Sequence, residues 1–276
     1  MDHHPPSSQS RIDFAQTSVR RIRAGEIEAA TQTERVAEET PIALEYNGIS
    51  HATMLASPAD LEDFALGFSL TEGIIGRASD VRGIDVVALP DGMIVQIEIS
   101  SACEVRLKER RRAMAGRTGC GLCGVETLPE VLRPVQPVAD TAPISIASVL
   151  HAMRSLRAHQ PLHDLTGATH VAAWADSEGQ IRLAREDVGR HNALDKLIGA
   201  LSRNNVSSLH GMVLVSSRAS FEMVQKCASA GVGVLAAVSA PTALAIRVAH
   251  NANVALLGFV RDADATLYTH AERIQN

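Results

Sequence analysis

Two cysteines stand one turn apart in a glycine-rich segment, Arg117-Thr118-Gly119-Cys120-Gly121-Leu122-Cys123-Gly124. Three glycines make this backbone pliable enough to expose both sulfur atoms. Cationic side chains crowd the approach to the pair, with only Glu104 and Glu109 opposing them: Arg106, Lys108, Arg110, Arg111, Arg112 and Arg117. Nearby cations favour the thiolate over the thiol, and the thiolate is the nucleophilic form of cysteine.

A cysteine pair of this spacing has three chemical interpretations. Structural zinc needs four Cys or His ligands, usually as two such pairs, and the remaining cysteines, Cys103 and Cys227, stand alone. We therefore expect no structural zinc. A thioredoxin-like dithiol opens a helix directly after a buried strand, whereas Cys120 follows a basic, glycine-broken stretch. The third interpretation is a sulfur-handling cysteine that attacks a donor persulfide and carries the terminal sulfur onward.

The composition is that of an ordinary soluble globular protein, with 46% hydrophobic and 21% charged residues in a chain of 276. A net charge of −5 argues against general nucleic-acid binding, so the basic cluster indicates a local anionic partner rather than a polyanion. The first ten residues lack the apolar core of a signal peptide, and polar residues interrupt the longest apolar run, 232–249. We expect a cytoplasmic protein that binds neither nucleic acid nor membrane. In that reducing compartment the cysteine pair is functional rather than a structural disulfide.

The first part of the chain predicts an α+β domain over residues 36–115, after a flexible lead over residues 1–35. Asn47-Gly48 joins two alternating runs into a hairpin, and Pro90-Asp91-Gly92 joins a second pair. Between the hairpins, a helix is expected to start at Ser57-Pro58, and its apolar stripe runs from Leu61 to Leu70. Residues 116–144 hold the cysteine loop and a proline-punctuated linker.

The second part, residues 145–276, has the rhythm of an α/β domain. A helix over 145–156 precedes two strands, 168–175 and 180–183, which are joined by a turn. Apolar strands at 212–215, 232–238 and 254–259 then alternate with helices. That alternation predicts a parallel sheet, so the fold class is α/β, with an α+β N-terminal domain before it.

Hydroxyl residues follow two of these strands, where each passes into a helix. Ser217 and Arg218 come after strand 212–215, and Ser239 comes after strand 232–238. Such junctions place free backbone N–H groups and the positive end of a helix at the carboxyl edge of the sheet, where phosphates or a cofactor could bind. The alternative, that Ser217 and Ser239 only cap helices, stays open. The planar guanidinium of Arg218 favours an anion.

The segment Glu186-Asp187-Val188-Gly189-Arg190-His191-Asn192 packs polar groups around one glycine, just before a predicted helix. These groups could cap the helix and form ion pairs. Alternatively, Arg190 and His191 bring a cation and an imidazole to the same sheet edge, as a cofactor site requires. Spacing alone does not make either His191 or the nearby His170 catalytic.

Several separated segments together resemble the formate dehydrogenase accessory sulfurtransferase family. They span nearly the whole chain from Tyr46 onward: 46–51, 65–75, 116–126, 186–196, 216–226 and 258–268. The resemblance implies a homodimeric cytoplasmic sulfur carrier whose second domain is similar in fold to cytidine deaminases. It also implies sulfur transfer from a cysteine desulfurase to the molybdenum or tungsten bis(molybdopterin guanine dinucleotide) cofactor, bound as cargo on its way to the catalytic subunit of formate dehydrogenase.

The resemblance also assigns residues. Cys120 corresponds to the residue that holds the persulfide, with Cys123 assisting, for instance by resolving it through a transient disulfide. The family's cofactor-binding stretch falls on six consecutive residues: Phe259, Val260, Arg261, Asp262, Ala263 and Asp264.

Two other functions remain as alternatives to sulfur transfer. Zinc deamination needs His-x-Glu followed by Pro-Cys-x-x-Cys, but here Gly119 precedes the cysteine pair and His270-Ala271-Glu272 lies far after it. Fold kinship alone does not make the chain a deaminase. The second alternative is a non-catalytic chaperone that binds, protects and inserts the cofactor, because the basic cluster suits a docking surface as well as an activated thiol.

Overall fold

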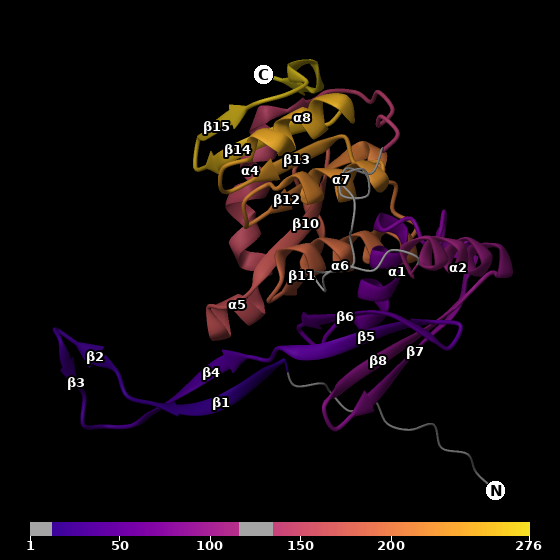
Figure 1. The fold of residues 1–276 in the computed structure, drawn as a ribbon. Helices are drawn as coiled ribbons and strands as arrows, with labels where there is room; N and C mark the ends of the chain where they lie inside the picture. The colour runs from indigo at the N-terminus through magenta and orange to yellow at the C-terminus, as the bar shows by residue number, and fades with distance from the viewer. Residues whose placement is uncertain (1–12, 116–134) are drawn as a thin grey trace, which may run out of the picture.

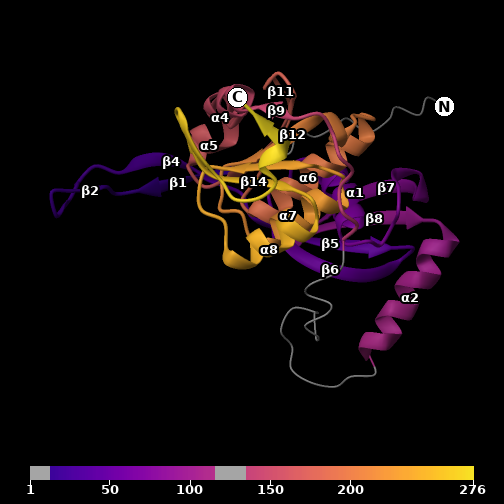
Figure 2. The same ribbon diagram turned by 90° about the horizontal axis from the view of Figure 1, so that it is seen from above.

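A computed structural model of the chain describes residues 13–115 and 135–276. A four-stranded sheet organises the first domain, and a six-stranded sheet organises the second. Figure 1 shows one domain above the other, with helices α1 and α6 at their boundary. A two-stranded arm projects from the first domain in both views, and Figure 2 shows helix α2 leading away from the body.

The arm is an antiparallel ribbon of β1 (Phe14–Val19) and β4 (Gln32–Ala37), extended by the short strands β2 (Ile22–Arg23) and β3 (Glu26–Ile27). Ala24 and Gly25 turn the tip, with φ angles of 51° and 86°. From residue 13 onward, the structure therefore differs from the flexible lead predicted over residues 1–35, because paired strands occupy most of this stretch. Both faces of the ribbon are largely exposed, so its strands lack the alternation of apolar and polar residues that makes a half-buried strand recognisable.

The first domain contains the two predicted hairpins side by side. One joins β5 (Thr40–Tyr46) to β6 (Ile49–Ala56), and the other joins β7 (Val81–Leu89) to β8 (Gly92–Ile99). Parallel pairing of β5 with β8 gives the strand order β6-β5-β8-β7. Asn47 and Gly48 adopt φ angles of 48° and 77°, the left-handed pair that a tight hairpin turn requires.

Two helices belong to this domain. Helix α1 (Leu61–Thr71) carries the predicted apolar stripe into the core, although it begins at Leu61, three residues after Pro58. Helix α2 (Ser101–Ala115) covers the stretch predicted as a basic approach to the cysteines. The basic stretch is therefore helical as far as Ala115, while Gly116, Arg117 and Gly119 lie outside the described residues.

The second domain is built on a mixed sheet with strand order β11-β10-β12-β13-β14-β15. Its strands are β10 (His170–Asp176), β11 (Ile181–Asp187), β12 (Gly211–Val215), β13 (Val234–Ala237), β14 (Ala255–Arg261) and β15 (Asp264–Leu267). Strands β12, β13 and β14 run parallel, as predicted. The predicted turn after residue 175 joins β10 to β11 as an antiparallel hairpin. The sheet as a whole is mixed, because β10 also runs antiparallel to β12, and a second hairpin joins β14 to β15.

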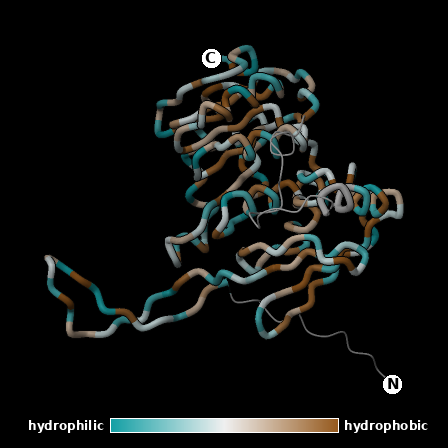
Figure 3. Tube along the Cα trace, viewed as in Figure 1, coloured by the Kyte–Doolittle hydropathy of each residue, from teal (hydrophilic) through white to brown (hydrophobic). Residues whose placement is uncertain are grey.

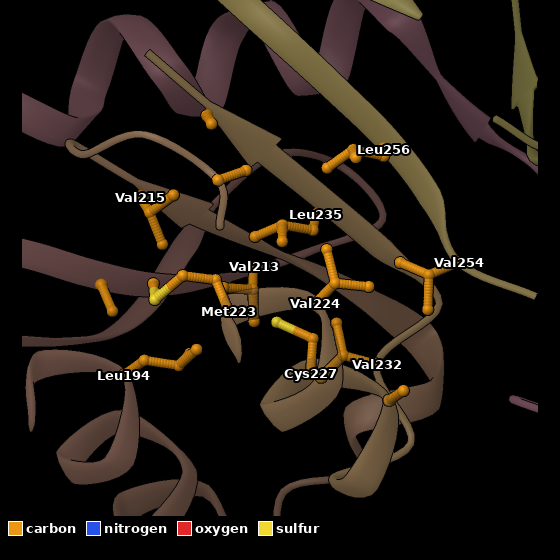
Figure 4. Packing of buried hydrophobic residues seen from close by; sticks show 14 of the residues in the cluster. Leu194, Val213, Val215, Met223, Val224, Cys227, Val232, Leu235, Val254 and Leu256 are labelled. Atoms are coloured by element: carbon orange, nitrogen blue, oxygen red, sulfur yellow. The ribbon is translucent and has the colours of Figure 1, made fainter. Parts of the chain in front are cut away.

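Helices cover both faces of this sheet. Alternate strand residues point to opposite sides, and Val213 and Val215 pack against α6 (Arg190–Arg203), α7 (Phe221–Ser229) and α8 (Ala243–Asn251). Met212 and Leu214 face α4 (Ile146–Ser155), which is followed by α5 (Pro161–Thr166). The short strands β9 (Ile144–Ser145) and β16 (Ile274–Gln275) pair beside the sheet. Figure 3 shows apolar residues concentrated along the sheet, and Figure 4 shows the α6–α7 side of the core.

The two domains meet where α1 crosses α6. A Cβ atom added at Gly67 would lie 1.7 Å from the carbonyl oxygen of Asp195, and one added at Gly199 would lie 1.9 Å from that of Asp63. These glycines let the two helix backbones touch, since any side chain would separate them. The crossing holds α6 against the first domain. The first turn of α6 lies at one edge of the six-stranded sheet.

Candidate functional site

One edge of the six-stranded sheet brings together the residues that the sequence marked separately. Strands β11, β12, β13 and β14 all end there, and β10 begins there, because it runs antiparallel to β11 and β12. The predicted residues of this edge are Arg190, His191, Ser217, Arg218, Ser239 and the stretch Phe259–Asp264. Arg190 and Asp264 are more than 70 residues apart in the sequence, and the order and direction of the strands bring them to the same edge.

Hydrogen bonds tie the neighbouring strand ends to one another. Ser216 donates its backbone N–H to the oxygen of Val171 at 3.1 Å, and its Oγ accepts from the N–H of Val171 at 3.0 Å. On the other side, the N–H of Phe259 bonds to the carbonyl oxygen of Ser239 at 3.3 Å. The edge is thus a continuous, bonded surface from β10 across to β14.

Neither Ser217 nor Ser239 caps a helix. Helix α7 begins after Ser220, while α8 begins after Thr242, whose Oγ1 accepts from the N–H of Ala245 at 3.2 Å. Ser217 is buried, and its hydroxyl donates to the carbonyl oxygen of Arg218 at 3.0 Å. The capping alternative therefore does not explain these two serines. Arg218 itself is exposed beside them.

The stretch Phe259–Asp264 forms the end of β14 and the turn into β15. Phe259 is 45% exposed and adopts a φ of 52°, a left-handed conformation that is costly for a bulky residue. Val260 is buried, whereas the other four residues are exposed. Arg261 donates from Nε to the carbonyl oxygen of Val238 at 3.1 Å, and Arg154 of α4 donates to that of Asp262 at 2.8 Å. The stretch thus combines an exposed aromatic residue with arginines that are held by main-chain carbonyl oxygens.

Arg190 and His191 are the first two residues of α6, directly after the end of β11. The Nε atom of Arg190 is buried and has no hydrogen-bond partner among the described residues. His191 contacts the carboxylate of Glu222 at the start of α7, with 2.9 Å between Nε2 and Oε2. This hydrogen bond is the main reason why the pKa of Glu222 lies below its ordinary value.

A cleft of about 510 Å³ opens at this edge, on the side of α4 and α5. Apolar side chains from Met153, Leu156 and Val238 line it together with polar groups. The polar lining includes Arg157, Gln160, His163, Thr169, His170 and Ser216. Such a mixture of apolar walls and a few polar groups is typical of small-molecule pockets.

The two histidines of the cleft are held differently. His163 has its Nδ1 2.8 Å from the carbonyl oxygen of Thr169, so Nδ1 carries the proton and Nε2 remains an acceptor when the ring is neutral. Burial is the largest cause of a lowered pKa at His170, and Arg190 is the next. The lowered pKa favours a neutral ring at His170, which can then both donate and accept a hydrogen bond.

His163, Arg157 and Gln160 line the cleft but were not predicted from the sequence as site residues. Pro161 opens the short helix α5, and Gly167 ends it with a φ of 70°. Proline at the start and glycine just past the end are the usual limits of a helix, so the sequence did contain a signal for α5. Only the antiparallel placement of β10 shows that His163 and His170 face the ends of β12 and β13.

The predicted catalytic residues, Cys120 and Cys123, lie outside the residues that the structure describes. Of the other cysteines, Cys103 and Cys227 are buried, and burial raises the pKa of Cys227 to about 12. In residues 13–115 and 135–276, no three His, Cys, Asp or Glu side chains gather in a way that could hold a metal ion. Over the same ranges, no helix has the length and apolar character to cross a membrane.

Comparison with known proteins gives consistent matches over almost the whole chain. A model of the FdhD/NarQ family matches residues 37–275. Sulfur carrier protein FdhD of Bordetella petrii is 71% identical over 273 residues, which cover 99% of this chain and 98% of the relative. The protein of the same name from Cupriavidus necator is 54% identical over 275 residues, covering 100% of this chain and 93% of the relative.

A solved structure has the same fold. The crystal structure of a candidate formate dehydrogenase accessory protein from Desulfotalea psychrophila superimposes with a TM-score of 0.75, covering 95% of this chain and 99% of the other. The two sequences are 24% identical, so this likeness concerns the fold alone. The fold and the site together define a two-domain protein of mixed α/β class with arginines gathered at one sheet edge. The chain belongs to the FdhD/NarQ family, which confirms the resemblance found in the sequence.

Proposed function

We propose that this protein is a sulfur carrier that serves formate dehydrogenase. The observation that carries the proposal is the 71% identity, over 99% of the chain, with a relative named sulfur carrier protein. The proposed reaction is a sulfurtransferase reaction in the cytoplasm, with a cysteine desulfurase as the source of sulfur. Its acceptor is the molybdenum or tungsten bis(molybdopterin guanine dinucleotide) cofactor, bound as substrate before it enters the catalytic subunit of formate dehydrogenase.

The proposed chemistry begins at Cys120. Its thiolate attacks the outer sulfur of the desulfurase persulfide, the donor S–S bond breaks, and the desulfurase cysteine leaves as a thiolate. Cys120 then carries the sulfur as its own persulfide. Attack by the Cys123 thiolate on the inner sulfur releases the terminal sulfur as hydrosulfide and leaves a Cys120–Cys123 disulfide. The cysteine pair supplies both electrons for that release and is oxidised to the disulfide. A cellular thiol must later reduce this disulfide.

The proposed place for the cofactor is the gathered sheet edge. Arg190, Arg218 and Arg261 lie at the ends of three different strands there, which suits a ligand with several phosphate groups. The first turns of α7 and α8 lie beside the same edge and add unpaired backbone N–H groups. A homodimer, as the family resemblance implies, belongs to the proposal as well.

The test separates sulfur loading from cofactor binding. The purified protein is incubated with a cysteine desulfurase and ³⁵S-cysteine, and guanosine diphosphate (GDP) binding is measured separately by calorimetry. Cys120→Ala is expected to lose the bound label and to keep its affinity for GDP, while the control Cys103→Ala, which alters a buried cysteine, keeps both. Equal labelling of Cys120→Ala and the unchanged protein contradicts the carrier role. GDP binding without any labelling favours the cofactor-binding chaperone instead.

A further inference from the structure

A fully buried ion pair lies directly behind the first turn of α6. Asp187 is the last residue of β11, and its Oδ2 atom is 2.6 Å from Nζ of Lys196 in α6. Both side chains are completely inaccessible to solvent. Neither residue lines the cleft, so the pair does not contact a ligand held there.

The Asp187 carboxylate accepts hydrogen bonds from three further donors. The backbone N–H of Gly189 bonds to Oδ1 at 2.7 Å, and the side-chain amide of Asn192 bonds to the same oxygen at 3.1 Å. The N–H of Ser57 bonds to Oδ2 at 3.0 Å. Gly189 and Asn192 flank Arg190 and His191 in the sequence, so one carboxylate fixes the chain on both sides of these two residues.

This cluster also connects the two domains. Ser57 follows β6 in the first domain, and its carbonyl oxygen accepts from Nζ of Lys196 at 2.9 Å. The hydroxyl of Ser57 accepts from the N–H of Val188 at 3.2 Å, while Asn192 donates to the carbonyl oxygen of Leu55 at 2.8 Å. The start of α6 is therefore held by the end of a first-domain strand.

The cluster leaves no spare room. A Cβ atom added at Gly189 would lie 2.8 Å from the amide nitrogen of Asn192 and 3.4 Å from Oδ1 of Asp187. The φ of Gly189 is −100°, which other residues also adopt, so the restriction comes from packing. A single methyl group at this position presses on the cluster and changes no charge.

Stability alone is a weak explanation for such a pair. Burying two charges costs about as much as their attraction returns, and apolar replacements are often as stable. The cluster does, however, determine where Arg190 and His191 lie. The guanidinium of Arg190 has its Nε buried and unbonded among the described residues, so its direction depends on the backbone that the cluster fixes.

We propose that Asp187 and Lys196, held by Ser57 of the first domain, are positioning residues that aim Arg190 and His191 at the sheet edge. Ligand affinity at the edge then depends on a contact between the domains. The identity of the ligand in this inference rests on the proposed function, whereas the placement of Arg190 does not.

The same helix offers a matched control. Asp195, also in α6, pairs with Lys226 of α7 at 2.9 Å and accepts from the hydroxyl of Thr71 in α1 at 2.7 Å. This pair is also buried and also joins the domains, but its side-chain hydrogen bonds go to Thr71 and Glu72 of the first domain and not to the cluster around Asp187. Lys226→Met removes a buried cation as Lys196→Met does, without disturbing the first turn of α6.

The first measurement is GDP affinity by calorimetry, with the thermal midpoint recorded for each variant. Gly189→Ala and Lys196→Met are expected to bind GDP roughly tenfold more weakly, as is common when groups that support a site are altered. Lys226→Met is expected to lower the thermal midpoint but to keep its GDP affinity. Equal weakening in the control, or unchanged affinity in Gly189→Ala and Lys196→Met, overturns the proposal.

A second measurement works even if the protein does not bind GDP, an outcome that would count against the proposed function alone. The pKa of His170 is lowered first by burial, then by Arg190 and His163, with a smaller effect of His191 and an opposing one of Asp187. Histidine NMR titration, assigned with His170→Gln, is expected to show a higher pKa for His170 in Gly189→Ala, because Arg190 moves away. An unchanged titration in Gly189→Ala, or an equal change in Lys226→Met, contradicts the positioning role.

Discussion

The contact between α1 and α6 predicts that Gly67→Ala is strongly destabilising. The new Cβ would lie 1.7 Å from the carbonyl oxygen of Asp195 and 2.8 Å from the N–H nitrogen of Gly199, whereas real contacts are essentially never below 3.0 Å. The helices must therefore separate by more than an ångström. That movement pulls Asp195 away from the hydroxyl of Thr71 in α1.

Overpacking a core by one methyl group typically costs about 1–3 kcal/mol, and the upper end applies because backbone meets backbone here. A loss of about 3 kcal/mol corresponds to a fall of roughly 6–12 °C in the thermal midpoint of a protein of this size. Calorimetry or urea unfolding measures it. Gly76→Ala is the matched control, since its nearest atom, Oδ2 of Asp80, is 3.7 Å away, and a change within about 0.5 kcal/mol is expected. A Gly67→Ala protein as stable as this control would refute the tight crossing.

Two further predictions concern charge. Arg218→Ala is expected to weaken GDP binding roughly tenfold with unchanged sulfur loading. Arg182→Ala, which removes another exposed arginine, paired with Asp176 away from the site, is expected to leave both unchanged. Identical GDP titrations of the two variants would remove Arg218 from the site. Burial raises the pKa of Cys227 from about 9 to about 12, so the stability that the neutral thiol contributes is complete below pH 9 and is lost as the pH rises toward 12. Urea unfolding between pH 9 and 11 should lose up to about 1.4 kcal/mol per pH unit from this thiol, and Cys227→Ala should show a shallower decline; parallel declines would contradict the burial of the ionisable sulfur.

The sequence predicted those elements whose residues show a regular pattern. Asn47-Gly48 between alternating runs identified the first hairpin, and the apolar spacing from Leu61 to Leu70 identified α1. The strand–helix alternation from residue 211 onward predicted the parallel centre of the second sheet. In each case a short stretch of sequence contains the whole signal, because a turn or an amphipathic face is a local property.

Tertiary arrangement accounts for what the sequence did not predict. The arm of β1 and β4 exposes most of both faces, so no apolar alternation distinguishes it from a solvated tail. The antiparallel pairing of β10 with β12 and the hairpin of β14 and β15 become visible only in the folded sheet. The role of Gly67 and Gly199 was also invisible, since a close helix crossing involves residues 132 apart in sequence.

The site was predicted in part. Strand ends followed by Ser217, Arg218 and Ser239 were found correctly at one sheet edge, because parallel strands end on the same side. Whether those residues bind the cofactor stays a prediction. The cleft residues His163 and Gln160 were missed because they come from α5 and the turn before it, which reach this edge only through the reversed direction of β10. The link from Ser57 to Asp187 spans 130 residues, and no local pattern announces it.

The location of the transferred sulfur distinguishes a sulfur carrier from a cofactor-binding chaperone. The protein is incubated with a cysteine desulfurase and cysteine, digested without reductant, and mapped by peptide mass spectrometry. We expect one added sulfur on the peptide that contains Cys120 and Cys123, lost on reduction, with Cys103 and Cys227 unmodified. If both cysteines of the pair stay unmodified while the protein still binds GDP, sulfur carriage is contradicted and the protein acts as a cofactor-binding chaperone.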